Sequence, residues 1–336
     1  WWSGVGLGIN AIGNPQHGLT YPPTWLLAVL PSLWGADLLI VLHLALFGFG
    51  VARLSRRLGA SPMPPAIAGA AGMLSGYATS MVVMGVPLMS MAWLPWVLVA
   101  ADGIARADAR RASVKAAALF GVAFALLVMA GDPAAAVTGS LASVLWLLAR
   151  APRPVRALGW LALGGLVAVV LSAATWMPAI AVIAESNRAG GVDAAAATSW
   201  SMHPLRALEW FSPGALGIPA DPSTDLGAIY ATAATDPSMG SGWALSLYLG
   251  VPLRVGIALG ASSERRNRFL LLASLVFVVL ALGHYTPLYG GYRWLFLPEQ
   301  LIRYPERHLA GALVIWLPLA GLGLHRLTTG EVARSR

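Results

Sequence analysis

Residues 36–57 read ADLLIVLHLALFGFGVARLSRR, an apolar run that ends in three closely spaced arginines. A transmembrane helix needs about 20 predominantly apolar residues, so this stretch is long enough to cross a membrane. Similar apolar runs recur along the chain, and every second gap between them is basic. The basic gaps hold Arg53, Arg56 and Arg57; Arg106, Arg110, Arg111 and Lys115; Arg150, Arg153 and Arg156; Arg265, Arg266 and Arg268; and Arg326, Arg334 and Arg336.

The alternate gaps carry most of the acidic residues. Because the orientation of a membrane protein follows the Lys and Arg content of its short loops, the basic face is predicted to be cytoplasmic. The chain is 57% hydrophobic and 11% charged, whereas soluble domains carry about 25% charged residues. These features predict a multi-pass membrane protein whose larger loops face outward.

The composition also argues against other classes. The net charge of +8 is explained by the cytoplasmic arginine clusters, so we predict no nucleic-acid partner. The chain has no cysteine, which excludes disulfides, thiolate catalysis and cysteine-based metal sites. The six histidines are too far apart in the sequence to show a metal-ligand spacing, so we predict no metal site.

The predicted fold class is all-α, a polytopic transmembrane helical bundle with two longer extracytoplasmic loops. Backbone polar groups must be paired within the protein in lipid, so the spans are expected to be helices. About nine spans are expected, at residues 36–52, 65–84, 87–104, 114–131, 134–149, 157–183, 243–260, 268–284 and 308–325. Two sets of glycines are expected to let helices approach closely: Gly69, Gly72 and Gly76, and Gly256 with Gly260.

Four regions follow from these spans. Residues 1–35 form part of a first extracytoplasmic loop, with Leu26–Leu30 as an interfacial or re-entrant piece. Residues 36–183 hold six spans, 184–242 form an extracytoplasmic loop, and 243–336 hold three spans with an outer loop at 285–307. The chain opens on Trp1 without a signal peptide, and its first 35 residues lack Lys and Arg. We therefore expect an N-terminally truncated fragment that has lost an upstream helix.

The loop at 184–242 is expected to contain one short helix, Pro204–Phe211, which begins at a proline and ends before Ser212-Pro213-Gly214. Leu205, Leu208 and Phe211 share one face of it, which suits a helix lying on the membrane surface. His203 and Glu209 flank this face and are expected to be solvated. Arg254 falls inside the predicted span 243–260, and no sequence feature explains it.

Arg303, Glu306 and Arg307 are the strongest candidates for a binding site. Arginine on the outer face runs against the positive-inside bias, and its planar guanidinium matches phosphate oxygens bidentately. One interpretation is a clamp on an anionic headgroup. The other is a pair of arginines that reach to the membrane interface, with Glu306 as a local partner.

Other candidates lie earlier in the chain. Asn14, His17 and Tyr21 belong to a polar, turn-rich segment just outside the first span, which suits either a substrate site or an ordinary entry turn. Asp132 lies in the tight outer hairpin Gly131-Asp132-Pro133, where it could face a catalytic cavity or cap the turn. His43 lies within the first span, where ionisable residues are functional candidates.

Short motifs along the whole chain resemble the YfhO-like bacterial membrane proteins, a group related to GT-C glycosyltransferases. The motifs are Asn14-Pro15, Tyr21-Pro22-Pro23, Arg56-Arg57-Leu58-Gly59, Ser75-Gly76-Tyr77, Ala92-Trp93-Leu94-Pro95, Ala130-Gly131-Asp132-Pro133, Arg303-Tyr304-Pro305-Glu306-Arg307 and Leu319-Ala320-Gly321-Leu322-Gly323. The resemblance implies a GT-C-like fold in the bacterial cytoplasmic membrane. It also implies transfer of a sugar from a polyprenyl-phosphate donor to a cell-envelope glycan or lipid acceptor on the extracytoplasmic face.

The resemblance further implies roles for particular residues. Arg303, Glu306, Arg307, Asn14, His17 and Tyr21 are expected to bind the substrate or its lipid phosphate. The main catalytic acid is expected upstream of Trp1, and Asp132 is the catalytic candidate within the chain, although the family pattern often has His there. No cofactor is assigned, and a divalent cation would accompany a phosphate donor in some enzymes of this kind.

Two other functions remain open from the sequence. A transporter or flippase of a lipid-linked or anionic envelope substrate would need polar residues near mid-span and internal repeats. The predicted spans are almost free of charge and show no repeat. A non-catalytic envelope-assembly protein would tolerate loss of Arg303 and Arg307, which a transferase would not.

Overall fold

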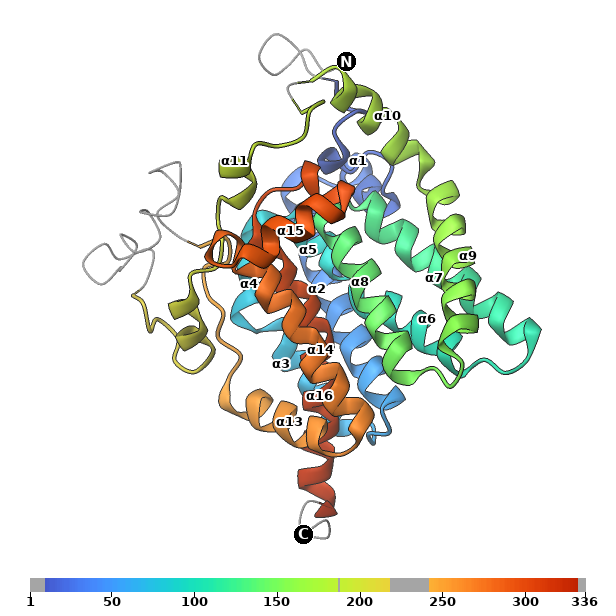
Figure 1. Ribbon diagram of the computed structural model, residues 1–336, viewed down its shortest axis with the longest axis vertical. Helices are drawn as coiled ribbons and strands as arrows, with labels where there is room; N and C mark the ends of the chain where they lie inside the picture. Colours follow the sequence, from blue (N-terminus) through green and yellow to red (C-terminus); the bar gives the residue numbers. More distant parts are fainter. Residues whose placement is uncertain (1–9, 187, 218–241, 332–336) are drawn as a thin grey trace. The chain divides into compact units, whose positions relative to one another are not determined.

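The computed structural model describes residues 10–186, 188–217 and 242–331, and most of these residues fold into helices (Figure 1). Within those ranges there is no β-strand, only one isolated bridge between Ala215 and Gly217. The all-α prediction is therefore confirmed. The opening residues from Trp1 and the acidic residues Asp221, Asp225 and Asp236 of the predicted outer loop lie outside the described residues.

Six helical segments of the described chain are long and apolar enough to cross a membrane, which indicates a multi-pass membrane protein. They are α2 (Ser32–Arg57), α5 with α6 (Val86–Met91 and Leu94–Arg106), α7 (Arg110–Met129), α8 (Pro133–Arg150), α9 (Pro154–Leu171) and α16 (Leu309–Thr329) with the short turn before it. A seventh is possible if α3 (Met63–Met73) and α4 (Gly76–Met84), which meet at a 48° bend, form one span.

Two predicted spans differ in detail from the structure. Residues 157–183 form two helices, α9 and α10 (Ala173–Ala184), because Ser172 interrupts the run. Its hydroxyl donates to the Ala168 carbonyl at 2.7 Å, a back-bond that bends helices. Residues 243–260 become helical only at α13 (Val251–Ser262), since Gly250 has a φ of 76° and Pro252 lacks the N–H of an interior turn.

A further helix, α14 (Arg265–Ala281), follows α13. Short elements connect the helices: η1 (Pro15–His17), η2 (Pro22–Trp25), α1 (Leu26–Val29), α11 (Ala194–Thr198), η3 (Pro204–Trp210), η4 (Gly283–Tyr285), α15 (Pro287–Leu295), η5 (Leu297–Leu301) and η6 (Pro305–His308). The predicted outer loop at 285–307 thus consists of short helices, and Leu26–Leu30 contains the short helix α1.

The chain divides into two compact units. The first unit comprises residues 1–47 and 84–191, the second comprises residues 48–83 and 192–336, and α2 runs from one into the other. In the first unit α7 packs against both α6 and α9. A Cβ atom on Gly121 would lie 2.8 Å from the Gly164 carbonyl, so small residues allow α7 and α9 to lie close together.

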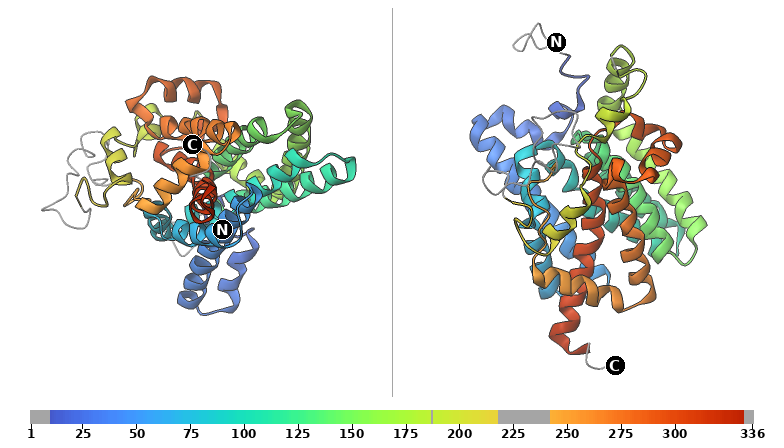
Figure 2. Two further views of the ribbon diagram at one scale, coloured as in Figure 1. Left: turned by 90° about the horizontal axis from the view of Figure 1, so that it is seen from below. Right: turned by 60° about the vertical axis from the view of Figure 1, so that its left-hand side comes forward.

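In the second unit the core is α16, which contacts α3, α13 and α14 (Figure 2). Its residues are buried from Leu309 to Gly323. The predicted role of Gly256 and Gly260 is confirmed there. A Cβ atom on Gly260 would lie 2.0 Å from the Leu319 carbonyl, and one on Gly256 would lie 2.7 Å from that of Ala320. Any larger side chain would force α13 away from α16.

The predicted surface helix is present as η3, a 3₁₀ helix rather than an α-helix. Its apolar residues Leu205, Leu208 and Phe211 are 45%, 50% and 63% exposed, whereas Arg206 and Glu209 are 2% and 6% exposed. Residues three apart eclipse one another in a 3₁₀ helix, so each set shares a face. On a helix at the surface of a soluble protein the apolar side chains are buried and the charged ones exposed. The opposite pattern on η3 suits contact with lipid.

Candidate functional site

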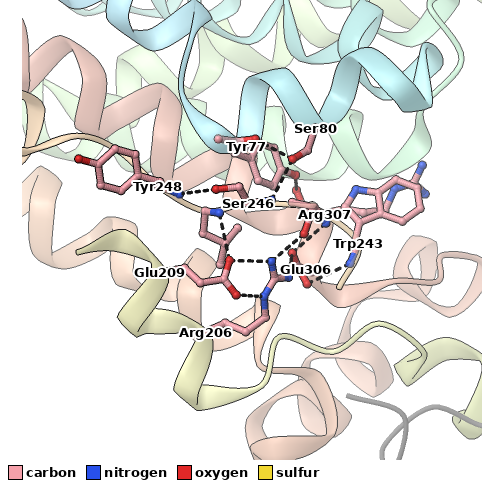
Figure 3. A network of polar contacts seen from close by, with 12 residues as sticks. Tyr77, Ser80, Arg206, Glu209, Trp243, Ser246, Tyr248, Glu306 and Arg307 are labelled. Carbon is pink, nitrogen blue, oxygen red and sulfur yellow. Dashed lines mark hydrogen bonds and ion pairs between the residues drawn. The ribbon is translucent and has the colours of Figure 1, made fainter. Parts of the chain in front are cut away.

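Arg303, Glu306 and Arg307 lie where η5, η6 and α16 follow one another in the second unit. Glu306 is fully buried, and Arg206 of η3 donates from Nη1 to Glu306 Oε1 at 2.5 Å. The same guanidinium also donates to Glu209, from Nε to Oε1 at 2.8 Å and from Nη2 to Oε2 at 3.0 Å. Figure 3 shows Arg206 between the two carboxylates.

Backbone groups of residues 243–247 also bond to these charged side chains. The N–H groups of Trp243 and Ala244 donate to Glu306 at 3.3 and 3.0 Å, and that of Leu247 donates to Glu209 at 3.2 Å. In turn Arg206 donates to the Ala244 carbonyl at 2.6 Å. The prediction that Glu209 is solvated is therefore wrong, because Glu209 is part of a buried ion network.

This network explains how a non-helical segment is tolerated where the sequence predicts a span. Backbone polar groups outside a helix must find partners elsewhere in the protein if they lie in a membrane. Further along the same segment, Ser246 N–H donates to Ser80 Oγ at 3.1 Å, and the Tyr248 carbonyl accepts from Gly76 N–H at 2.9 Å (Figure 3). Charged side chains thus take the place of the missing helical hydrogen bonds.

Arg307 is buried, and its guanidinium carbon lies 4.7 Å above the centre of the Trp243 ring and 5.8 Å from that of Tyr304. Arg303 is half-buried, and its guanidinium carbon lies 4.8 Å from the centre of the Tyr304 ring. Tyr304 and Trp243 stack on one another at 5.1 Å. Both arginines therefore rest on aromatic faces, which orient a guanidinium.

Another buried carboxylate, Glu299 of η5, holds the loop at 285–307 against the start of α16. Its Oε1 atom accepts from the Tyr289 hydroxyl at 3.1 Å and is 3.0 Å from His308 Nε2. Burial and this carboxylate raise the pKa of the Tyr289 hydroxyl well above its ordinary value. Glu299 was not among the predicted site residues, because its position after Leu297-Pro298 resembles an ordinary loop.

Tyr21 lies in the first unit, fully buried in a chain of hydrogen bonds. His43 Nδ1 is 2.6 Å from the Leu39 carbonyl and must carry the proton, so Nε2 accepts from the Tyr21 hydroxyl at 2.6 Å. The Trp93 indole then donates to the Tyr21 oxygen at 2.7 Å. Burial raises the pKa of Tyr21 to about 12. Tyr21 and His43 thus anchor the entry loop to α2 and α6.

Asn14 and His17 form the ends of η1. Asn14 Oδ1 accepts from the Gln16 N–H at 3.1 Å, and the amide nitrogen of Asn14 is 3.4 Å from His17 Nε2. Both side chains are at least partly exposed. Asn14 therefore caps η1, as an ordinary entry turn would.

Asp132 is buried and caps α8, since its Oδ1 accepts from the Ala134 N–H at 3.0 Å. The preceding Gly131 has a φ of 98°, and a Cβ atom there would lie 2.4 Å from the Pro15 carbonyl. The structure thus brings the Asn14–His17 turn against the Gly131-Asp132 hairpin. The bond from the Ala134 N–H is the one expected of a turn-capping Asp132.

The predicted residues therefore fall into two groups. Asn14, His17, Tyr21 and Asp132 belong to the first unit, whereas the arginine stretch belongs to the second. Sequence analysis did not identify Arg206 as the partner of Glu306. The only signal was the opposite charge of Arg206 and Glu209, three residues apart beside an apolar face.

No group of three or more His, Asp or Glu side chains that could hold a metal ion is present in the described part of the chain. In comparisons with protein-family models, curated proteins and solved structures, none matches this chain.

Proposed function

We propose that this chain is a membrane glycosyltransferase that moves a sugar from a polyprenyl-phosphate donor to a cell-envelope acceptor on the extracytoplasmic face of the bacterial cytoplasmic membrane. The observation that carries the proposal is the position of Arg307. Its buried guanidinium lies on the Trp243 ring, just before the long apolar helix α16 begins. Arg303 lies four residues earlier in the chain.

The location of these arginines favours an anionic ligand. The start of a helix carries a partial positive charge, so a cation there is unfavourable for the helix itself. Arginine on an outer membrane face also runs against the positive-inside bias. Glu306 accepts from Arg206 and from two backbone amides. A planar guanidinium matches the oxygen atoms of a phosphate bidentately.

The backbone of Arg307 is tied to an apolar part of the second unit. The Tyr77 hydroxyl donates to the Arg307 carbonyl at 3.1 Å. Tyr77 also lines a small apolar pocket together with Leu309, Leu313 and Trp316. These four side chains are buried, so the pocket helps to fix Arg307 and is not itself a path for an isoprenoid chain.

In the sugar-transfer reaction the two arginines act on the leaving phosphate. The acceptor hydroxyl oxygen attacks the anomeric carbon of the donor, and the bond from that carbon to the phosphate oxygen breaks. Negative charge develops on the departing phosphate, which fixed guanidinium groups stabilise. The acceptor proton passes to a base, and Asp132 is already engaged as the cap of α8.

We further propose the nine-span, GT-C-like arrangement, with α14 and the segment from residue 242 to the end of α13 as crossings besides the seven apolar spans. The chain has no cysteine, so single-cysteine variants can test this directly. Ser212→Cys and Gly290→Cys should react with an impermeant maleimide on intact cells, and Ser262→Cys only after lysis. Labelling of all three on intact cells would contradict the arrangement.

The function itself is tested by native mass spectrometry of the detergent-purified protein, followed by a sugar-transfer assay. The wild-type protein should retain a polyprenyl phosphate, and Arg303→Ala with Arg307→Ala should lose it. Arg254→Ala is the matched control, because Arg254 also lies on an aromatic ring, 4.9 Å above Phe211. Retention of the lipid by the double variant, or its loss from the control, would refute the phosphate site. Lipid binding without transfer would favour a transporter.

A further inference from the structure

Trp200 and Tyr304 have an unusual backbone. Among the described residues they are the two that have positive φ without being glycine, with values of 53° and 73°. Such a conformation is strained for a bulky side chain and persists where the surrounding structure holds it, often at binding sites. Their rings contact one another, with centroids 4.5 Å apart. Both strained positions of the described chain therefore belong to one cluster.

Trp243 completes this aromatic cluster, with its ring centroid 5.3 Å from that of Trp200 and 5.1 Å from that of Tyr304. The indole Nε1 atoms of Trp200 and Trp243 are buried and have no hydrogen-bond partner among the described residues. Buried donors are nearly always paired in folded proteins. Two unsatisfied indole N–H groups in one cluster indicate a ligand that supplies acceptor atoms.

The cluster offers donors and ring faces rather than acceptors. Arg307 lies over Trp243 and Arg303 over Tyr304, so a positively charged ligand is excluded by repulsion. Aromatic faces are negative and apolar, and they suit the C–H face of a sugar ring. Sugar hydroxyl oxygens can accept from the indole N–H groups. An uncharged sugar attached to an anionic group would contact the aromatic rings through the sugar and the arginines through the anion.

We propose that Trp200, Trp243 and Tyr304 form a glycosyl-recognition subsite, which binds the sugar of a phosphate-linked donor while Arg303 and Arg307 hold its phosphate. This inference rests on the proposed function. Trp200, Arg303 and Tyr304 are half-buried and form the accessible edge, whereas Trp243 and Arg307 are buried and form the floor. The backbone of Tyr304 is held because its carbonyl accepts from the Arg307 N–H and because Glu306, two residues further on, is bonded to Arg206.

The test uses the full detergent-purified chain and three kinds of probe: inorganic phosphate, a panel of hexose 1-phosphates, and the corresponding free hexoses. Calorimetry should show at least one hexose 1-phosphate binding about tenfold more tightly than phosphate. Trp200→Phe and Trp243→Phe keep a ring but lose one donor, and each should weaken that binding about five- to tenfold. Their affinity for phosphate should not change. Trp294→Phe, at a ring that is 79% exposed, is the matched control.

A second measurement does not depend on the variants folding. In the wild-type protein labelled with ¹⁵N at the indole nitrogens, the preferred hexose 1-phosphate should shift the N–H signals of two buried indoles, and phosphate alone should not. The signals are assigned by their loss in the two variants, or by their slow solvent exchange if a variant does not fold.

Each result bears on the proposal. Equal affinity for phosphate and hexose 1-phosphates, or a preference retained in both Trp variants, would overturn the subsite and leave the phosphate site intact. Failure of every phosphate probe would instead contradict the proposed function. In that case the free hexoses decide: binding that requires Trp200 and Trp243 supports the subsite, and no binding refutes it.

Discussion

Replacement of Glu306 by alanine should strongly destabilise the second unit. Glu306 accepts from Arg206 and from the backbone N–H groups of Trp243 and Ala244, and it is fully buried. Arg206 would keep its bidentate contact with Glu209, so its charge would not be left alone. The two backbone donors, in contrast, would lose their acceptor inside the protein.

The magnitude follows from these contacts. A buried polar group left without a partner costs about 1–3 kcal/mol, and the lost hydrogen bond to a charged group contributes about 1.5–3 kcal/mol more. With some structural relaxation, we expect a loss of about 3–5 kcal/mol, within the range for breaking a buried ion pair. Glu306→Gln retains an acceptor oxygen and the side-chain volume, so its cost should be smaller, about 1–3 kcal/mol.

The assay is thermal unfolding of the detergent-purified protein, followed by size-exclusion recovery after heating. Glu306→Ala should lower the apparent Tm by on the order of 10 °C, given about 2–4 °C for each kcal/mol. Glu185→Ala removes an exposed carboxylate and serves as the control, with a change within about 0.5 kcal/mol. If Glu306→Ala unfolds like the control, the carboxylate does not hold residues 243–248, and the account of the network is refuted.

Three further outcomes are expected. Tyr21→Phe removes the hydroxyl that donates to His43 and should lower stability by about 1–3 kcal/mol in the same thermal assay. Circular dichroism should show no loss of secondary structure. An unchanged Tm would show that the buried hydrogen-bond chain is dispensable. Gly260→Val should disrupt packing against Leu319, because a Cβ atom at residue 260 would already overlap the Leu319 carbonyl. A variant that folds normally and is equally stable would contradict the close approach of α13 and α16. Burial lowers the pKa of His203, and its Nδ1 atom accepts a hydrogen bond from the Leu205 N–H. The unfolded chain therefore binds more protons at His203 than the folded protein does as the pH falls below about 6.5. Stability should therefore fall between about pH 7 and pH 5, and His203→Asn should reduce this slope, whereas an unchanged slope would assign it to other groups.

Several structural features could be predicted from local sequence because their causes are local. Apolar runs between charged gaps produce helices wherever the chain crosses lipid, since no other backbone arrangement pairs its own polar groups. The same logic placed Gly256 and Gly260 at a helix contact and put the apolar face of Pro204–Phe211 outward. The prediction was less accurate at residues 243–250, where Gly250 and Pro252 stop the helix.

The partners of the charged residues could not be predicted in this way. Arg206 and Glu306 are a hundred positions apart, and nothing in either neighbourhood indicates the other. The same holds for Trp200, Trp243 and Tyr304, which three separate segments bring together. Side-chain contacts at such separations depend on how helices and loops pack, and the apolar sequences that direct this packing tolerate many arrangements.

The amino-acid sequence by itself determined the class of this protein, the orientation expected from its arginine clusters, and the choice of Arg303 and Arg307 as candidates for anion binding. These depend on composition and on the order of charges along the chain. Only the tertiary structure decided that Glu306 belongs to a buried network with Arg206, that Tyr21 and Asp132 have anchoring and capping contacts, and that an aromatic cluster surrounds Arg307. Such contacts form between segments distant in sequence, and only the folded chain brings their atoms within hydrogen-bonding or ring-stacking distance.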